Sequence, residues 1–204
     1  MKFASTTLLI SLFLLSTVAL AQSDMHKKDA PKAPAAKSDA QVAFDTVKAL
    51  AGEWEGKVTT DMPIAKDIDN LLIHVTMRVT SRGNVVVHEF QEAGTPLDSS
   101  KYDHPVTMLY LDQDRLNLVH YCDAGNRPHM TATLSPDRKL IDFSFADLSG
   151  GDAMGHMYHI AFRVIDQNHH VEDFTYMMPG NKPVHANMDL RRKADTGSTN
   201  GIGR

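Results

Sequence analysis

Residues 71–92 read LLIHVTMRVTSRGNVVVHEFQE, and this stretch decides the fold. Its first half alternates in polarity, which would place four apolar residues on one face of a β-strand: Ile73, Val75, Met77 and Val79. Ser81 to Asn84 includes a glycine and an asparagine, which tolerate the positive φ of a hairpin turn. A second strand follows over 84–92. The stretch therefore predicts a β-hairpin with one apolar face.

The same strand–turn–strand pattern recurs along most of the chain. Alternation predicts strands at 54–60, 71–80, 84–92, 106–111, 116–122, 129–134, 140–145, 154–165, 171–178 and 184–192. Short polar turns join most of them as hairpins, as at 112–114 and 135–138. An all-β, about ten-stranded antiparallel up-and-down barrel is favoured over a sandwich, because closure removes the exposed edges of a flat sheet.

One short helix precedes these strands. Ser38 or Asp39 can cap its start, and Gly52 can end it. Between them an apolar stripe recurs at spacings of three and four residues, formed by Ala43, Phe44, Val47, Leu50 and Ala51. The sequence therefore predicts a single N-terminal helix ahead of an otherwise all-β domain.

The first 21 residues have the pattern of a secretory signal peptide. Lys2 supplies the positive start, residues 8–20 are mostly apolar, and Ala19-Leu20-Ala21 resembles a cleavage site. As a helix this run would span about 20 Å, less than the roughly 30 Å hydrocarbon core of a bilayer. Cleavage after Ala21 and a secreted or periplasmic location are expected, and no stable membrane anchor.

Composition divides the remainder into three parts. Residues 22–40 are predicted to be a disordered linker, 41–193 the β-barrel domain and 194–204 a disordered tail. Cys122 is the only cysteine, so the core must stabilise the domain without an internal disulfide. The net charge is −4, with 21 basic and 25 acidic residues, and such a balance provides no basic face for nucleic acid. The oligomeric state is left open.

Two segments carry a resemblance to known proteins. Residues 50–56, LAGEWEG, place a helix end before Gly-x-Trp-x-Gly, which resembles the opening of calycin-type barrels, the lipocalin-like and nitrobindin-like proteins. Residues 120–128, HYCDAGNRP, resemble a segment of uncharacterised exported bacterial proteins with the same opening. The resemblance covers about residues 43–193. It implies a calycin-like barrel that binds something small and apolar.

The resemblance also suggests how the barrel closes. In lipocalin-like barrels the tryptophan of the first strand packs under an arginine of the final strand, and Trp54 matches that tryptophan. Strand alternation favours Arg192 over Arg191 as the inward-pointing arginine. The expected role of the pair is structural. The alternative is a tryptophan in the core and a solvated arginine.

Alternation also selects candidate pocket residues. The apolar faces of strands 116–122 and 154–165 also carry His120, Cys122, His156 and Tyr158. Neighbouring strands can add Met108 and Tyr110, or Phe174 and Tyr176. Loop 123–128 can fold over the barrel mouth and present Asn126 and Arg127. The candidate ligand-binding residues are therefore His120, Cys122, Tyr110, Asn126, Met130, His156 and Tyr158. The alternatives are histidines satisfied within the core and an ordinary polar hairpin.

Cofactors are weakly indicated. Nitrobindin-like barrels bind haem through a histidine, but no position of this sequence can be matched to that ligand. Two histidines, a thiolate and a carboxylate could hold zinc, yet no pair of ligands lies close together in the sequence. His169-His170 is read as an exposed turn, and the 11 methionines as core.

Three functions remain from the sequence. The first is an exported protein that binds a small apolar, amphipathic or haem-like ligand. The second is a barrel enzyme, an isomerase or hydrolase with His120 as general base, which would need a second polar group beside that imidazole. The third is a ligand-free interaction module of the cell envelope with an exposed apolar patch. No nucleophile elbow, phosphate loop or zinc-protease motif occurs, so no catalytic residue is assigned.

Overall fold

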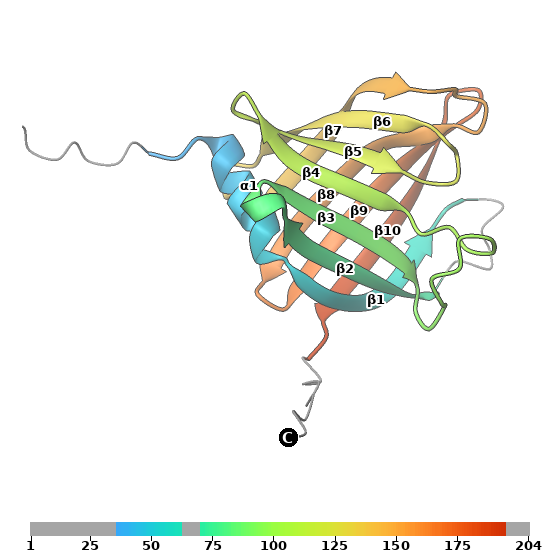
Figure 1. Cartoon of the computed structure of the whole chain (residues 1–204), viewed down its shortest axis with the longest axis horizontal. Coiled ribbons are helices and arrows are strands. Elements are labelled where there is room, and N and C mark those ends of the chain that lie inside the picture. The colour runs from blue at the N-terminus through green and yellow to red at the C-terminus, as the bar shows by residue number, and fades with distance from the viewer. Residues whose placement is uncertain (1–35, 63–69, 195–204) are drawn as a thin grey trace, which may run out of the picture. The chain divides into compact units, whose positions relative to one another are not determined.

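Ten antiparallel strands form a closed barrel in the computed structural model, which describes residues 36–62 and 70–194 (Figure 1). The order around the barrel is β1-β10-β9-β8-β7-β6-β5-β4-β3-β2, so each strand pairs with its neighbour in the chain and β1 pairs with β10. The predicted fold class is confirmed. The expected signal peptide, residues 22–35 of the expected linker and residues 195–204 of the expected tail lie outside the described residues.

The bounds of the elements agree closely with the sequence pattern. In chain order they are α1 (Asp39–Ala49), β1 (Gly52–Thr60), β2 (Leu72–Thr80), the 3₁₀ turn η1 (Ser81–Gly83), β3 (Val85–Glu92), β4 (Val106–Asp112), β5 (Arg115–Tyr121), β6 (Arg127–Leu134), β7 (Leu140–Ser149), β8 (His156–Asp166), β9 (His169–Met178) and β10 (Lys182–Arg192). The helix starts at Asp39, so the expected linker, drawn to residue 40, overlaps the helix by two residues.

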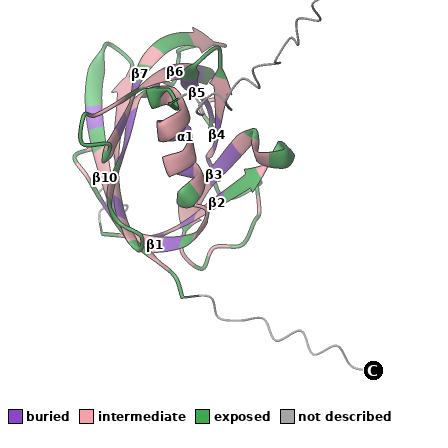
Figure 2. Cartoon of the chain, turned by 90° about the vertical axis from the view of Figure 1, so that its left-hand side faces the viewer, coloured by how far each residue is buried: buried purple, intermediate pink, exposed green. Residues whose placement is uncertain are grey.

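Helix α1 lies across one end of the barrel, against β4, β5 and β6 (Figure 2). Ser38 caps its first turn, because its hydroxyl accepts a hydrogen bond from the Gln41 N–H at 3.3 Å. The buried face of the helix consists of Ala43, Phe44 and Val47. This face closes that end of the barrel with apolar side chains. No helix in the described part of the chain is long and apolar enough to cross a membrane.

The interior of the barrel is largely filled by apolar side chains. A single core cluster joins α1 to the inward faces of the strands, and its largest fully buried members are Trp54, Phe143 and Phe162. Because these side chains occupy the space between opposite walls, most of the barrel is a packed core rather than an open lumen.

The Gly-x-Trp-x-Gly segment forms the seam where the barrel closes. A Cβ at Gly56 would overlap the carbonyl oxygen of Asp189, so only glycine allows β10 to lie this close to β1. Gly52 has a φ of +137°, and a Cβ there would overlap the guanidinium of Arg192. Both glycines therefore serve the pairing of the first strand with the last.

Arg192 joins this seam to the end of α1. Its guanidinium carbon lies 4.1 Å from the centre of a Trp54 ring, the pairing that the resemblance implies, made by the arginine that strand alternation selects. The same guanidinium donates hydrogen bonds to the carbonyls of Ala51 at 2.7 Å and Ala49 at 3.2 Å. The arginine thus satisfies carbonyls at the end of the helix and places a positive charge at its negative pole.

Candidate functional site

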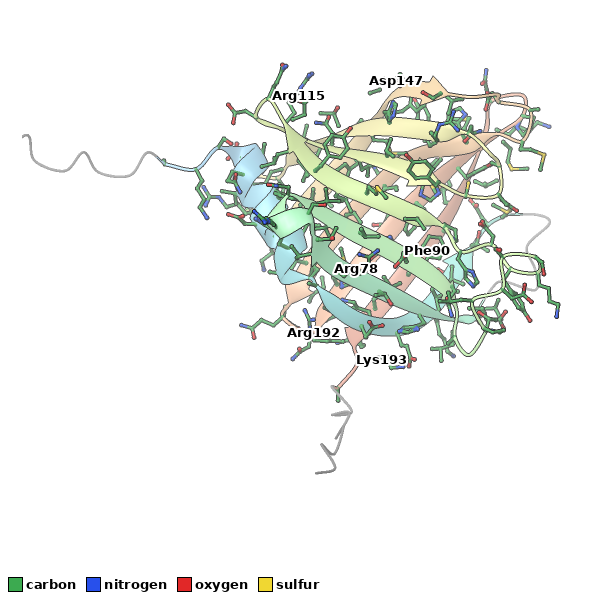
Figure 3. The ribbon with its side chains drawn as sticks, in the orientation of Figure 1. Arg78, Phe90, Arg115, Asp147, Arg192 and Lys193 are labelled. Carbon is green, nitrogen blue, oxygen red and sulfur yellow. The ribbon has the colours of Figure 1, made fainter. Side chains whose placement is uncertain are left out.

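A small cavity opens at the barrel end opposite α1. It has a volume of about 170 Å³, and the groups that it exposes are apolar. Figure 3 shows Arg192 on the α1 side of the barrel and Phe90 nearer the other end. The cavity is lined by Val58, Thr60, Met62, Ile73, Phe90, Met157, Phe174, Tyr176, Val184, His185, Ala186 and Met188. All of them lie on β1, β2, β3, β8, β9 and β10 except Met62, which follows β1.

The size of the cavity limits what can occupy it. Pockets for drug-sized ligands have volumes of about 300–1,000 Å³, whereas an apolar cavity of about 150 Å³ stays dry and accepts benzene. Haem does not fit. His185 is the only imidazole in the described lining; it is exposed, points outward by strand alternation, and hydrogen-bonds Thr175 through Nδ1.

A layer of buried polar side chains crosses the barrel between this cavity and the α1 end. The Glu172 carboxylate lies 2.9 Å from His88 Nε2 and 2.8 Å from His170 Nε2. All three residues are at most 1% exposed. The ring of His170 meets the Trp54 ring edge-on at 4.2 Å. A carboxylate and two imidazoles therefore form a closed cluster in the buried core.

Charge explains why the cluster is stable. Burial raises the pKa of Glu172, but the charge of His88 and the hydrogen bonds from both histidines outweigh it and bring the pKa down to about 2. The carboxylate is therefore ionised and accepts from both Nε2–H groups. Among the described residues, no protein group accepts from or donates to the Nδ1 atoms of His88 and His170.

His120 lies in the same layer. Its Nδ1 and the Thr107 hydroxyl share a hydrogen bond of 2.8 Å, and both residues are 1% exposed. Burial, together with the charge of His88, lowers the pKa of His120 to about 4. The imidazole is therefore neutral at physiological pH, and it does not line the cavity. The Thr107 hydroxyl is the second polar group that the enzyme hypothesis needs beside this imidazole. A general base must also reach its substrate, and the burial of His120 away from the cavity does not provide that access.

The other residues expected in the pocket do not line the cavity. Met130 is buried in the apolar core. Tyr110 lies on the outer face, because the preceding residue, Leu109, is fully buried inside. Met108 shares the outer face of Tyr110 and is 41% exposed. Phe174 and Tyr176, the alternative pair, do line the cavity.

Cys122 follows β5 and borders a surface hollow formed with residues 99–104. Burial and the carboxylates of Asp103 and Asp123 raise the pKa of its thiol, against one backbone hydrogen bond that lowers it. A thiol held in its protonated form is a poor metal ligand and a poor nucleophile. In the described ranges, no group of three or more histidine, cysteine, aspartate and glutamate side chains is placed to hold a metal ion.

Asn126 has a structural role instead of presenting donors at the mouth. It is 1% exposed, and its amide nitrogen donates to the carbonyls of Gly151 at 3.0 Å and Gly155 at 2.7 Å. These bonds tie the β5–β6 connection to the β7–β8 connection. Arg127, by contrast, is exposed at the start of β6.

A β-bulge moves Tyr158 out of the interior. Met157 pairs with Tyr176 and His159 with Thr175, which leaves Tyr158 without a partner on β9. Strict alternation placed Tyr158 inside, but it is 42% exposed and stacks on Phe145. The bulge instead turns Met157 toward the cavity.

His156 also lies beside the cavity rather than in it. Its Nδ1 hydrogen-bonds the Asp152 carboxylate at 2.7 Å, and its ring packs 4.9 Å from that of Phe145.

The sequence reading missed the residues of the buried cluster. His170 is fully buried, so the interpretation of His169-His170 as an exposed turn is wrong for this residue. Alternation on β9 places His170 and Glu172 on the face of Phe174, and alternation on β3 places His88 on the face of Phe90. The same argument that was applied to β5 and β8 would have identified all three.

The fold and the site define a closed ten-stranded antiparallel barrel with a small apolar cavity and a buried polar layer. No protein-family profile matches the chain, and no curated protein matches it in sequence. Among solved structures, Rv2717c from M. tuberculosis is similar, with a TM-score of 0.53 and 15% identity over 74% of this chain and 98% of that one. A protein with unknown function from the DUF3598 family of Nostoc punctiforme aligns with a TM-score of 0.38 and 13% identity, over 72% of this chain and 48% of that one. The first likeness shows the shared fold alone.

Proposed function

We propose that the protein binds a small uncharged apolar molecule, or the apolar end of an amphipathic one, in the cavity opposite α1. The observation that carries this proposal is a hollow of about 170 Å³ with apolar walls in a barrel that is otherwise packed. A cavity of this kind gains little from water, which needs two to four polar partners, whereas an apolar guest regains dispersion contacts with the walls.

The sequence adds two supports. The resemblance of residues 50–56 to the opening of lipocalin-like and nitrobindin-like barrels favours a ligand-binding role. The signal-peptide pattern of residues 1–21 favours a role outside the cytoplasm, where such a protein would sequester or present its ligand. Haem is not proposed as the ligand, because the cavity is too small and the bordering imidazole points away from it.

The test is a titration with toluene, followed by the methyl resonances of Ile73 and Met157 and by thermal unfolding. Both residues line the cavity, so saturable shifts at both, together with a higher melting temperature, are expected. In Ala186→Phe the new ring would fill the cavity and should abolish both effects. Ala153→Phe, the same substitution in an exposed loop, should retain them. An undiminished response in Ala186→Phe would place the ligand elsewhere.

Protein isolated from its own cells gives a second test. Native mass spectrometry should show a bound apolar mass and a chain that begins at Gln22, and the absorbance spectrum should lack a Soret band. A Soret band in that preparation would mean that haem binds and would overturn the assignment of a small ligand.

One observation favours an interaction module as the second candidate. On the outer faces of β4 and β5 the apolar pairs Met108–Val119 and Val106–Tyr121 are cross-strand neighbours. Met108 and Tyr121 are 41% and 40% exposed. If this face binds a partner in the envelope, Met108→Lys should remove a cross-linked complex without changing the toluene titration.

A further inference from the structure

The floor of the cavity rests on the buried cluster. On β3, His88 is the inward-facing residue two positions before Phe90, and on β9 Glu172 is two positions before Phe174. Both lie deeper in the barrel than the two phenylalanines that line the cavity. The rings of His88 and Phe90 lie 5.9 Å apart, and those of Phe90 and Phe174 lie 5.8 Å apart. Two aromatic rings therefore separate the cavity from the carboxylate–histidine cluster.

The charged groups that face the cluster are few. His120 of β5 lies in the same layer as the cluster and is affected by the charge of His88. The Arg192 guanidinium lies on the Trp54 ring that His170 contacts. Direct cross-strand neighbours of the cluster carry no charge: Met77, Thr107, Phe162, Val164, Met188 and Leu190. The described inward side chains of β6, β7 and α1 in the core, such as Met130, Phe143 and Phe44, are apolar.

Proton uptake by this cluster is poorly tolerated while the core is dry. One protonated imidazole is balanced by the Glu172 carboxylate. A second proton must go to His120 or to the Nδ1 of His88 or His170, for which the described residues offer no hydrogen-bond partner. It leaves a net positive charge in the cluster. A state in which water reaches the cluster would hold that proton more easily. On β3 and β9 the inward residues between the cluster and the cavity are Phe90 and Phe174.

We propose that the cluster of His88, Glu172 and His170 makes the cavity acid-sensitive: uptake of a proton loosens the floor and releases the ligand. This inference rests on the proposed function, because it concerns the same cavity. The ligand binds the state in which the cavity floor is closed and excludes water. The additional proton binds the state in which the floor is open and hydrated. Linkage then requires that each weakens the binding of the other.

The experiment measures the toluene dissociation constant of the full chain from pH 7.5 to pH 5.5. Toluene does not titrate, so any change belongs to the protein. The dissociation constant should rise as the pH falls, by at most about tenfold per pH unit when one proton is linked to release. Imidazole nitrogen shifts, recorded over the same interval, report which ring takes up the linked proton. Titration of surface histidines alone would overturn the inference.

Two variants separate the cluster from general effects of pH. In the triple variant His88→Phe, His170→Phe and Glu172→Met, apolar groups replace the charges, an exchange that buried ion pairs often tolerate. Its dissociation constant should not change with pH. The matched control is the exposed pair His74–Glu53, 2.6 Å apart on β2 and β1, changed to Phe and Met. It should keep the wild-type pH profile.

The outcomes distinguish the two proposals. Absence of toluene binding at every pH overturns the proposed function and, with it, this inference. Binding with a dissociation constant that is the same at pH 7.5 and pH 5.5 overturns this inference alone. An acid-weakened dissociation constant that persists unchanged in the folded triple variant also overturns it, because another group must then hold the proton.

Discussion

The two ends of the barrel are built differently from the same ten strands. At the α1 end, the helix lies across the opening, Trp54 is fully buried, and Arg192 binds helix carbonyls. At the other end, aromatic and aliphatic walls leave a cavity of about 170 Å³. Both ends belong to the same closed ring of ten strands. The difference therefore arises from side-chain volume and from what covers each opening, which suggests one end for stability and the other for binding.

Truncation of the large rings should give the largest contrast between the ends. Trp54→Ala removes a fully buried indole and leaves a void, so the free energy of unfolding should fall by about 3–5 kcal/mol. Phe90→Ala removes a half-buried ring beside an existing cavity and should lower the free energy of unfolding by less than half that amount. Urea denaturation of both variants measures the difference. Equal losses would mean that the cavity end supports the fold as strongly as the α1 end.

Acid should destabilise the layer between the ends. The pKa of His120 is 6.5 when exposed and about 4 in the folded protein, so below pH 6.5 the unfolded chain binds the proton preferentially. Stability is therefore fully present above pH 6.5 and is lost as the pH falls toward 4, by about 3 kcal/mol. Thr107→Val combined with His120→Phe should remove this loss in denaturation series at each pH, and His185→Gln, at an exposed site, should not.

Glu172 has a lower, separate window. Its pKa falls from 4.5 to about 2 on folding, so its stabilisation is present above pH 4.5 and is lost as the pH falls toward 2. The double variant of Thr107 and His120 should retain this second loss. A single acid transition that disappears entirely in that variant would show that the layer titrates as one unit.

Two neighbouring arginines provide a test of the closed end. Arg192→Ala removes a cation over an indole and several hydrogen bonds to carbonyls, and should lower stability by about 2 kcal/mol. Arg191→Ala removes only an exposed pairing with Asp189 and should change stability by less than about 0.5 kcal/mol. Thermal unfolding of the pair gives the comparison, and similar effects would argue against a specific role of Arg192.

The helix cap should have the smallest effect. Ser38→Ala removes the acceptor for the Gln41 N–H and should destabilise by about 1 kcal/mol. Ser144→Ala, at an exposed position of β7, should stay within about 0.5 kcal/mol. Neither variant should alter the toluene titration, since both lie away from the cavity. An effect of Ser38→Ala on binding would show that the two ends are coupled.

The fold was predictable because its signals are local. Alternation identified the ten strands, glycines and polar turns marked the hairpins, and two candidate caps, Ser38 and Asp39, marked the helix start. Alternation also selected Arg192 over Arg191 for the Trp54 ring. Each of these depends on the side chains of one strand or one turn.

The site was less predictable because it depends on breaks in that pattern and on distant partners. The bulge at Tyr158 reverses which of the preceding residues on β8 face the interior, and no residue type in that segment predicts a bulge. The bonds of Asn126 to Gly151 and Gly155 join loops that are distant in sequence. His88 and Glu172 were accessible to the alternation argument, but their 84-residue separation gave no reason to consider them together.

The pairing of β1 with β10 has a consequence for how the chain acquires its structure. The ring cannot close until the residues near Arg192 have been synthesised, and contacts of such long sequence separation slow folding. Until then the earlier strands form an open sheet with unpaired edges, which are prone to associate with other chains. Completion of the barrel is thus a late, cooperative event. A chain that ends before β10 should keep two unpaired, aggregation-prone strand edges and should not form a smaller barrel.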